Sequence, residues 1–493
     1  MLQSINARTG LAHGAAWAES TSRDIDLAAL QARQVARDFA ASTTGLRATL
    51  LRGIGQRLLF AREALVALAD RETGLGLPRL NGELDRTVYQ LEQFALALDQ
   101  GAVHLLLDEP AVAGAAPLGR PRMTRIRVPL GPVAVFAASN FPFAFSVAGG
   151  DTASALAAGC PVIVKAHPAH PALSLALAEQ VQAAVAQCGL PAAVFQLVQG
   201  AGIAVGVTLV QAPAIAAVAF TGSLKAGRAL ADLAAARPRP IPFFGELGSV
   251  NPLIVLPAAL ASGAAQRAAA LAQSITLGAG QFCTSPGVIL VPQGEPGDGF
   301  VRELAGQLSQ MQPHGMLTAG IRQSFESGVQ AWCHVRGAQV LAGQAGGSAA
   351  TPCATLVQVS AADYLAQPAL QHEVFGPAAL VVRTAALQEM EDVLGAIGGT
   401  LTVTLWGIDG DAAQVTDEIQ ALVRRATDVA GRVLFAGVPT GVAVTAAQQH
   451  GGPYPASTAP GTTSVGLAAM DRFLRPVALQ DAPDGLIQRL ACG

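Results

Sequence analysis

The 493-residue chain lacks the marks of a membrane-spanning, exported or nucleic-acid-binding protein. It contains no run of about 18 uninterrupted apolar residues, so no transmembrane helix is expected. Residues 1–10 lack a basic patch followed by an apolar core, so no signal peptide is expected either. The 31 basic and 34 acidic residues are scattered and give a net charge of −3, which argues against a nucleic-acid partner.

Cysteine is scarce, and its spacing argues against two kinds of site. No two cysteines form a Cys-x-x-Cys pair, as a disulfide framework or a bound metal such as zinc would favour. The thiols are therefore expected to be reduced and the protein to be cytoplasmic. Free cysteine is commonly buried as a small apolar residue, so most of the six need no chemical role. The six are Cys160, Cys188, Cys283, Cys333, Cys353 and Cys492.

Length and patterning predict an α/β protein of two or three domains. Amphipathic helices are expected at 24–40, 43–73 and 79–100, before an Ala-, Gly- and Pro-rich linker at 109–121. Strands then alternate with helices, which indicates βαβ units and a parallel sheet. This alternation runs through 123–129, 133–137, 145–158, 162–165, 171–188, 194–198, 209–212 and 217–221. A second α/β unit is expected from 254–255, 288–292, 351–382 and 400–406.

A glycine-rich segment at 200–206 resembles a dinucleotide-binding loop at first sight. Its spacing is Gly-x-Gly-x-x-x-Gly rather than Gly-x-Gly-x-x-Gly, and no acidic residue ends a following strand at the right place. An ordinary turn is the preferred interpretation.

Four residues in separate segments could carry chemistry. Cys283 lies in a Gly-bounded loop or helix start, where a helix N-terminus would stabilise the reactive thiolate. Glu246 lies in an uncharged, Gly-rich apolar stretch, which should raise the pKa of its carboxyl group and suit a general base. Asn140 follows a strand and could donate a hydrogen bond to an oxyanion. Lys165 ends a strand, where open α/β sheets bind ligands.

Each of the four also has an ordinary structural interpretation. Taken alone, the cysteine would be a core thiol and the glutamate a buried, paired carboxylate. The asparagine would be a turn residue and the lysine a solvated surface charge. Their combination in one chain, in this order, is what favours a catalytic site.

With these residues in place, the chain resembles the aldehyde dehydrogenase superfamily over essentially its whole length. Six motifs follow the family order: Ser-Asn140-Phe-Pro, Val-Lys165, Phe-Thr-Gly222-Ser223 through Gly227, Gly-Glu246-Leu-Gly-Ser-Val-Asn-Pro, Gly-Gln-Phe-Cys283-Thr and Glu373-Val-Phe-Gly-Pro377. Within it, the chain is similar to the α-ketoglutaric semialdehyde (2,5-dioxovalerate) dehydrogenases of sugar-acid breakdown. That likeness rests on Lys165-Ala-His-Pro-Ala-His-Pro171, the segment 242–252, His450-Gly-Gly-Pro-Tyr-Pro and Arg472-Phe-Leu-Arg-Pro-Val477.

The resemblance implies NAD(P)-dependent oxidation of an aldehyde to a carboxylic acid. The Cys283 thiolate would attack the aldehyde carbon, and the oxyanion would be held by the Asn140 side chain and the Cys283 backbone N–H. After hydride transfer, water deprotonated by Glu246 would hydrolyse the thioester.

A cofactor site is implied as well, and one departure bears on its preference. NAD-preferring members commonly carry a glutamate three positions after the family lysine, where this chain has Pro168. No carboxylate is then expected to repel a 2′-phosphate, and Lys165 would attract it, so NADP is expected to be accepted and preferred over NAD. The implied cofactor-binding residues are Lys165, His167, Pro168, Gly222, Ser223, Gly227, Glu373 and Phe375.

The substrate pocket is implied by family position. Phe145 and Ala148, on the helix after Asn140, would line it with Phe282 and Thr284 beside the cysteine. A dicarboxylic semialdehyde also needs a partner for its distal carboxylate, and arginine would suit because it pairs bidentately. The sequence offers Arg475 and the loop at 450–458, although Arg475 is as readily a structural ion-pair residue.

The implied architecture is an aldehyde dehydrogenase-like α/β fold in three parts. Residues 1–110 and 131–247 would form a Rossmann-like NAD(P)-binding domain, and 248–441 an α/β catalytic domain. Residues 111–130 and 442–493 would form a small β oligomerisation flap. Because an unpaired edge strand favours aggregation, this flap is expected to pair with a neighbouring subunit in a homodimer or homotetramer.

Three alternatives stay open at this point. The substrate could be another aliphatic or aromatic aldehyde. The acyl group could pass to coenzyme A instead of water, although the presence of Glu246 argues against that. The chain could also be a non-catalytic member of the fold, against which the intact Cys, Glu, Asn and Lys set argues.

Overall fold

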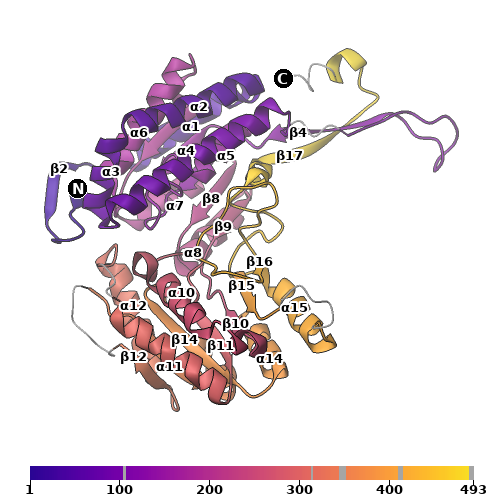
Figure 1. Ribbon diagram of the computed structural model, residues 1–493. Helices are drawn as coiled ribbons and strands as arrows, with labels where there is room; N and C mark the ends of the chain where they lie inside the picture. The colour runs from indigo at the N-terminus through magenta and orange to yellow at the C-terminus, as the bar shows by residue number, and fades with distance from the viewer. Residues whose placement is uncertain (104–106, 312–314, 344–350, 409–414, 488–493) are drawn as a thin grey trace.

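The computed structural model describes residues 1–103, 107–311, 315–343, 351–408 and 415–487 (Figure 1). Cys492 therefore lies outside the described residues. Two sheets covered by helices form two lobes, and a narrow arm, defined as residues 107–129 and 474–480, projects from the body. None of the described helices is long and apolar enough to cross a membrane.

The first lobe is built on a five-stranded parallel sheet in the order β7-β6-β5-β8-β9. Helices cover both faces of this sheet, so its strands are nearly continuous apolar runs. Asn140, Lys165, Gly222 and Glu246 all lie at or just after the carboxyl ends of its strands, which meet at one edge. The strands are β5 (Val133–Phe136), β6 (Val162–Lys165), β7 (Phe195–Val198), β8 (Ala217–Thr221) and β9 (Phe243–Glu246).

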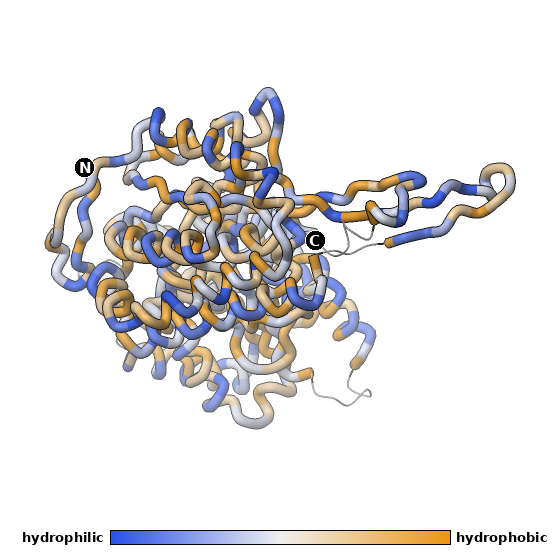
Figure 2. Tube along the Cα trace, turned by 90° about the horizontal axis from the view of Figure 1, so that it is seen from above, coloured by the Kyte–Doolittle hydropathy of each residue, from blue (hydrophilic) through white to orange (hydrophobic). Residues whose placement is uncertain are grey.

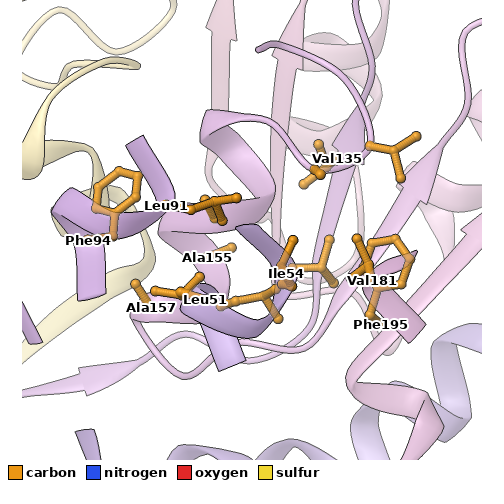
Figure 3. Close-up of a cluster of buried hydrophobic side chains, with 14 of the residues drawn as sticks. Leu51, Ile54, Leu91, Phe94, Val135, Ala155, Ala157, Val181 and Phe195 are labelled. Atoms are coloured by element: carbon orange, nitrogen blue, oxygen red, sulfur yellow. The ribbon is translucent and has the colours of Figure 1, made fainter. Parts of the chain in front are cut away.

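One hydrophobic core fixes the helices on one face of this sheet. Leu51, Leu91 and Ala155 pack against Val135 and Phe195 of the strands, as Figure 3 shows. A short hairpin, β1 (Leu2–Ile5) and β2 (Ala12–Trp17), precedes the helices. The helices of the whole lobe, on both faces, are α1 (Ser22–Ala40), α2 (Thr44–Phe60), α3 (Arg62–Thr73), α4 (Leu77–Asp99), α5 (Gly150–Ala157), α6 (Pro171–Gln187), α7 (Ile203–Gln211) and α8 (Leu224–Ala235).

The single helix predicted at 43–73 is wrong, because the chain forms two helices there. Helix α2 ends at Phe60 and α3 begins at Arg62. Ala61 between them has φ −91° and ψ 9°, yet its N–H still bonds Arg57 O at 3.0 Å. Hydrogen bonding thus continues through the kink. Apolar periodicity alone therefore does not reveal that the helix is divided at Ala61.

The helix predicted at 145–158 begins five residues later, at Gly150. The preceding residues form a tight turn, in which a Cβ on Gly149 would lie 2.5 Å from Ala144 O. Buried Glu83 holds this turn by accepting hydrogen bonds from Phe143 N (2.8 Å) and Ala144 N (3.0 Å). Phe145 and Ala148 therefore precede α5 and do not lie on it.

The second lobe contains a seven-stranded sheet in the order β12-β13-β14-β11-β10-β15-β16, parallel except for β12. Each large sheet lies within one predicted range, and the domain boundaries themselves stay predictions. The strands are β10 (Leu253–Val255), β11 (Val288–Pro292), β12 (Gln339–Ala342), β13 (Thr355–Ser360), β14 (Ala378–Thr384), β15 (Thr400–Trp406) and β16 (Ala430–Leu434). The helices are α9 (Pro257–Ala261), α10 (Ala264–Thr276), α11 (Glu295–Gln310), α12 (Ala319–Cys333), α13 (Ala361–Ala366), α14 (Leu387–Ile397) and α15 (Asp417–Val429).

The arm carries a three-stranded antiparallel sheet that joins distant parts of the chain. Strand β4 (Met123–Pro129) pairs with β17 (Leu474–Gln480) on one side and with β3 (Leu107–Glu109) on the other. Figure 2 shows the arm extending well beyond the body, with apolar and polar residues interspersed along it. Arg475 lies exposed on β17 opposite Val128, so the structure places it in the arm.

Candidate active site

Cys283 lies in a turn between α10 and β11, and not at the start of a helix. The turn follows a short 3-10 segment, Leu277–Gly280, in which Gly278, Ala279 and Gly280 have positive φ of 59°, 55° and 67°. Asn251 Nδ2 donates to Cys283 O at 2.8 Å and to Ser285 O at 3.0 Å, which fixes the turn on both sides of the sulfur. The expected stabilisation of the thiolate by a helix N-terminus is therefore wrong.

Glu246 and His450 lie directly beside this sulfur. His450 Nε2 is 3.6 Å from Cys283 Sγ and 3.1 Å from Glu246 Oε1. Ser464 Oγ donates to the other carboxylate oxygen, Glu246 Oε2, at 2.6 Å. The side chains of Glu246 and His450 are 4% and 1% exposed, so water screens their interaction poorly. Nucleophile, imidazole and carboxylate thus form one cluster, in which Glu246 and His450 are buried and Cys283 is half-buried.

The pKa expected for Glu246 is corrected by this arrangement. Burial favours the neutral acid, but the charge of His450 and hydrogen bonds from His450, Ser464 and Cys283 outweigh it and lower the pKa of Glu246. The sequence around Glu246 indicates apolar surroundings, but its hydrogen-bond partners His450, Ser464 and Cys283 come from other segments. For the thiol, burial and then the charge of Glu246 raise the pKa of Cys283 well above its usual value.

Asn140 reaches the cysteine turn from the end of β5. Its Nδ2 donates to Gln281 O at 3.0 Å, two residues before Cys283. Arg79 of α4 holds the Asn140 backbone, with Nη2 donating to Asn140 O at 2.7 Å. The Arg79 guanidinium also stacks 4.6 Å from the centroid of the Phe282 ring. The structure therefore brings Asn140 and Phe282 to the nucleophile.

Arg86, seven positions after Arg79 on α4, is a half-buried cation near the same cluster. Its guanidinium lies 5.3 Å from the centroid of the Phe145 ring, and Phe145 lies 6.3 Å from the His450 ring. Its charge interacts with those of Cys283 and Glu246. Arg86 Nη1 is buried and has no hydrogen-bond partner among the described residues. A buried, unpaired guanidinium N–H is costly unless a ligand satisfies it.

The remaining predicted pocket residues are less closely tied to the cluster. Thr284 is 1% exposed beside the cysteine, and Ala148 is 2% exposed within the core of the first lobe. Their roles in the pocket stay predictions.

The implied cofactor-binding residues Lys165, Gly222 and Ser223 lie at the carboxyl edge of the first sheet. Ser223 is the N-cap of α8, with Oγ accepting from Ala226 N at 3.3 Å, and Gly222 N donates to Glu246 O. A Cβ on Gly227 would lie 2.1 Å from Leu247 Cδ2, so α8 approaches β9 closely. Burial lowers the pKa of Lys165 to about 8, and Lys165 forms no salt bridge with any described residue. These residues fit a phosphate-bearing cofactor.

His167 and Pro168, two and three positions after this lysine, bring no carboxylate to it, but Glu19 does. Glu19 Oε2 accepts from Ala201 N at 3.1 Å, in the glycine-rich turn before α7, and its charge raises the pKa of Lys165. The expectation that no carboxylate would be available here is therefore wrong. The carboxylate comes from a segment about 150 positions away in sequence, which no local motif reveals.

Glu373 and Phe375 line a pocket together with Ser249 and Phe282. The loop that carries them packs on the cysteine turn: a Cβ on Gly280, whose φ is 67°, would lie 2.2 Å from the backbone of Gly376. Only glycine fits at such an approach. Glu373, one of the implied cofactor-binding residues, thus lies next to the segment that carries the nucleophile.

Comparison with known proteins agrees with this geometry. The profile described as the aldehyde dehydrogenase family matches residues 3–425. The chain belongs to the aldehyde dehydrogenase family. This aldehyde dehydrogenase is an oxidoreductase, and the family uses NAD or NADP.

Two curated relatives cover nearly the whole chain. α-Ketoglutaric semialdehyde dehydrogenase 2 of Azospirillum brasilense is 44% identical over 94% of this chain and 88% of its own length. The α-ketoglutaric semialdehyde dehydrogenase of Acinetobacter baylyi is 39% identical over 99% of this chain and 92% of its own.

Solved structures confirm the fold. A glyceraldehyde-3-phosphate dehydrogenase of Methanocaldococcus jannaschii complexed with NADP superposes with a TM-score of 0.82 at 19% identity, covering 97% of this chain and 98% of its own. An aldehyde dehydrogenase of Physcomitrella patens in complex with succinate gives a TM-score of 0.80 at 19% identity, covering 98% and 95%. The predicted aldehyde dehydrogenase-like α/β fold is confirmed.

Sequence reasoning missed the chemistry of four residues in this aldehyde dehydrogenase: Arg79, Arg86, Glu19 and His450. The sequence indicates His450 only as part of the motif His450-Gly-Gly-Pro-Tyr-Pro and of the loop at 450–458, with no catalytic role. The two arginines sit at i and i+7 of one helix with Glu83 between them, a spacing that places all three on one face. That pattern is the one signal that could have found the arginines from sequence.

Proposed function

We propose that this aldehyde dehydrogenase oxidises α-ketoglutaric semialdehyde (2,5-dioxovalerate) to 2-oxoglutarate and prefers NADP to NAD. The observation that carries the reaction is the buried Glu246 carboxylate beside the sulfur of Cys283, which supplies a nucleophile and a deacylating base in one site.

The side chains support an ordered reaction. The Cys283 thiolate forms a C–S bond with the aldehyde carbon, and the developing oxyanion accepts hydrogen bonds from Asn140 Nδ2 and the Cys283 backbone N–H. Glu373 and Phe375 would hold a nicotinamide cofactor, which would supply the oxidant by taking up hydride from that carbon. Glu246 then takes a proton from water, which attacks the thioester and releases the acid.

The relatives and Arg86 support the choice of substrate. Both relatives are named for α-ketoglutaric semialdehyde, and 2,5-dioxovalerate carries one carboxylate at the end opposite its aldehyde. Arg86 offers a buried N–H without a partner among the described residues, close to Phe145. A guanidinium in such surroundings suits a carboxylate.

A panel of aldehydes tests the substrate. Initial rates should be measured with 2,5-dioxovalerate, succinic semialdehyde, an alkanal and an aromatic aldehyde, each with NAD and NADP and with and without coenzyme A. The proposal expects the highest kcat/KM for 2,5-dioxovalerate and free acid as product. Preference for a simple alkanal, an acyl-coenzyme A product, or no reduction with any aldehyde would each overturn it.

The cofactor preference rests on charge at the adenosine end. Lys165 can pair with a 2′-phosphate, and Pro168 presents no carboxylate to oppose it. The negative charge of Glu19 interacts with Lys165, and it should reduce the ratio of NADP to NAD affinity. A kcat/KM for NAD well above that for NADP would contradict the proposed preference.

The arm supports a homodimer or homotetramer. Strand β3 is an edge strand of an exposed sheet, and pairing with a second subunit would satisfy its free edge. A cytoplasmic location is proposed with it, because a catalytic thiol needs a reducing compartment.

A further inference from the structure

The position of His450 raises a question that the steps above leave open, namely which group takes the proton from the Cys283 thiol. The sulfur, the imidazole nitrogen Nε2 and a carboxylate oxygen of Glu246 all lie within 4.8 Å of one another. They come from three distant segments: the end of β9, the turn before β11 and the loop between β16 and β17. Such a convergence places a base in contact with the nucleophile.

The thiol needs such a base, because its surroundings favour the protonated form. Burial and the negative charge of Glu246 both act against the thiolate, and no helix N-terminus compensates. Arg86 of α4 and Arg432 of β16 act in favour of the thiolate, whereas Glu373 acts against it. Among the described residues, two bases are in hydrogen-bond contact with the sulfur, His450 and Glu246, and Glu246 is needed in its ionised form to deprotonate water later.

We propose that His450 accepts the thiol proton of Cys283 and that Glu246 stabilises the resulting imidazolium. This inference rests on the proposed aldehyde oxidation and names a further catalytic residue for it. The S–H bond breaks and an N–H bond forms at Nε2, while the sulfur lone pair forms the C–S bond to the aldehyde. When the thioester is hydrolysed, the C–S bond breaks and the proton returns from Nε2 to sulfur. This regenerates the Cys283 thiol and the neutral His450 imidazole.

The geometry supports His450 as the proton acceptor and Glu246 as the anion that stabilises the imidazolium. Nε2 lies 3.6 Å from Cys283 Sγ and 3.1 Å from Glu246 Oε1, so an imidazolium there contacts both the thiolate and the carboxylate. Ser464 binds Oε2, which leaves Oε1 for the imidazole. The backbone of His450 is held by Thr463, with N donating to Oγ1 at 2.8 Å. With the thiol proton taken by His450, Glu246 stays ionised for its later task of deprotonating water.

Alkylation of Cys283 by iodoacetamide tests the proposal without aldehyde or cofactor. The pH dependence of the rate should be compared in the wild type, His450→Phe and His450→Gln, with Cys283→Ser identifying the reaction at this sulfur. His334→Gln, at an exposed position after α12, is the matched control.

We expect the wild type to be alkylated at a rate that levels off below the ordinary thiol range of about 8.5. Both His450 variants should titrate at least one pH unit higher and react about tenfold more slowly at pH 7. His334→Gln should match the wild type. Unchanged pH profiles in both His450 variants would overturn the proposal.

A second measurement keeps the proposal testable if the variants do not fold, which thermal melting will show. The ultraviolet absorbance of thiolate, taken as wild type minus Cys283→Ser, should be present at pH 7 and disappear on acidification. Its absence until above about pH 9, the range of an unassisted thiol, would overturn the proposal. Because neither measurement involves turnover, failure of the substrate panel alone would count against the proposed function and not against His450.

Discussion

Asn140 has two amide hydrogens, and the protein uses one of them for Gln281 O. The other is the proposed oxyanion donor, so Asn140→Ala should lower kcat about 10²–10³-fold, because one such donor contributes on the order of 3–4 kcal/mol. Stopped-flow measurement of cofactor reduction gives this value directly. Thermal melting controls for loss of the Gln281 contact, and a decrease of less than about tenfold would contradict the proposed role.

Lys165 predicts a pH dependence of cofactor choice. Its pKa of about 8 lies below that of an ordinary lysine, so the free site loses its positive charge as pH rises through about 8. A 2′-phosphate stabilises the charged form and should hold the proton, so the Kd for NADP should rise by up to about tenfold per pH unit above pH 8. Titration calorimetry between pH 6.5 and 9.5 should show a much smaller change for NAD. Parallel curves for the two cofactors would count against Lys165 as the phosphate partner.

Glu19→Gln is the companion variant at the same end of the site. The amide can keep the contact with Ala201 N while the negative charge beside Lys165 is removed. We expect kcat/KM for NADP to increase several-fold relative to NAD, since less charge opposes the phosphate. Glu63→Gln, on α3, is a control for a general change in net charge. An unchanged ratio would show that Glu19 does not reach the cofactor.

Single residues were predictable where the signal is local. Cys283, Glu246, Asn140 and Lys165 each stand in a short segment whose neighbours already indicate a turn or strand end. The contact between His450 and Glu246 spans 204 positions, and that between Glu19 and Ala201 spans 182. The pKa of Glu246 was predicted in the wrong direction for this reason, because its partners come from the far end of the chain.

Helix α4 places Arg79 over the ring of Phe282 and Arg86 over the ring of Phe145, and Arg86 is the proposed partner of the substrate carboxylate. Arg86→Met keeps much of the apolar stem but removes the charge. We expect KM for 2,5-dioxovalerate to rise about 10–100-fold, as loss of a charged pair of roughly 1.5–3 kcal/mol implies, with little change for an uncharged alkanal. Steady-state kinetics with both aldehydes measures the difference. Equal loss for both would point to misplacement of Phe145 instead.

At the scale of elements, the sequence predicted the positions of apolar strands correctly but not the boundaries of several helices. Strands β5, β6 and β8 lie where the apolar patterns put them, because a buried parallel strand is a short continuous apolar run. The kink at Ala61 and the turn before Gly150 depend on contacts from elsewhere, in the second case from Glu83 of α4. Such contacts leave no periodic signal in the segment that they shape.

The arm should decide the assembly of the whole molecule. Removing residues 474–493 deletes β17 and leaves β4 without one of its two partners. We expect this variant to be monomeric by light scattering where the full chain is a dimer or tetramer. Replacing residues 112–120 at the tip by a short turn keeps the sheet and serves as the control. A truncated chain of unchanged size would show that subunits meet elsewhere.

The overall α/β fold was predictable because strand and helix patterns alternate along most of the chain. The order of strands within each sheet was not, since it depends on which strands pair across the core. The hairpin formed by β1 and β2 and the projecting position of Arg475 also follow from pairing between distant segments.

The close approach of Gly280 to Gly376 leaves no room for a methyl group between two loops. The turn that carries the sulfur and the loop that carries Glu373 must therefore shift together or not at all. Lys165 and Glu19 sit apart from this contact, at the ends of the first sheet and its adjoining turn. We therefore expect substitutions at Lys165 and Glu19 to alter cofactor choice without displacing the nucleophile, and substitutions in the loop of Glu373 to displace it.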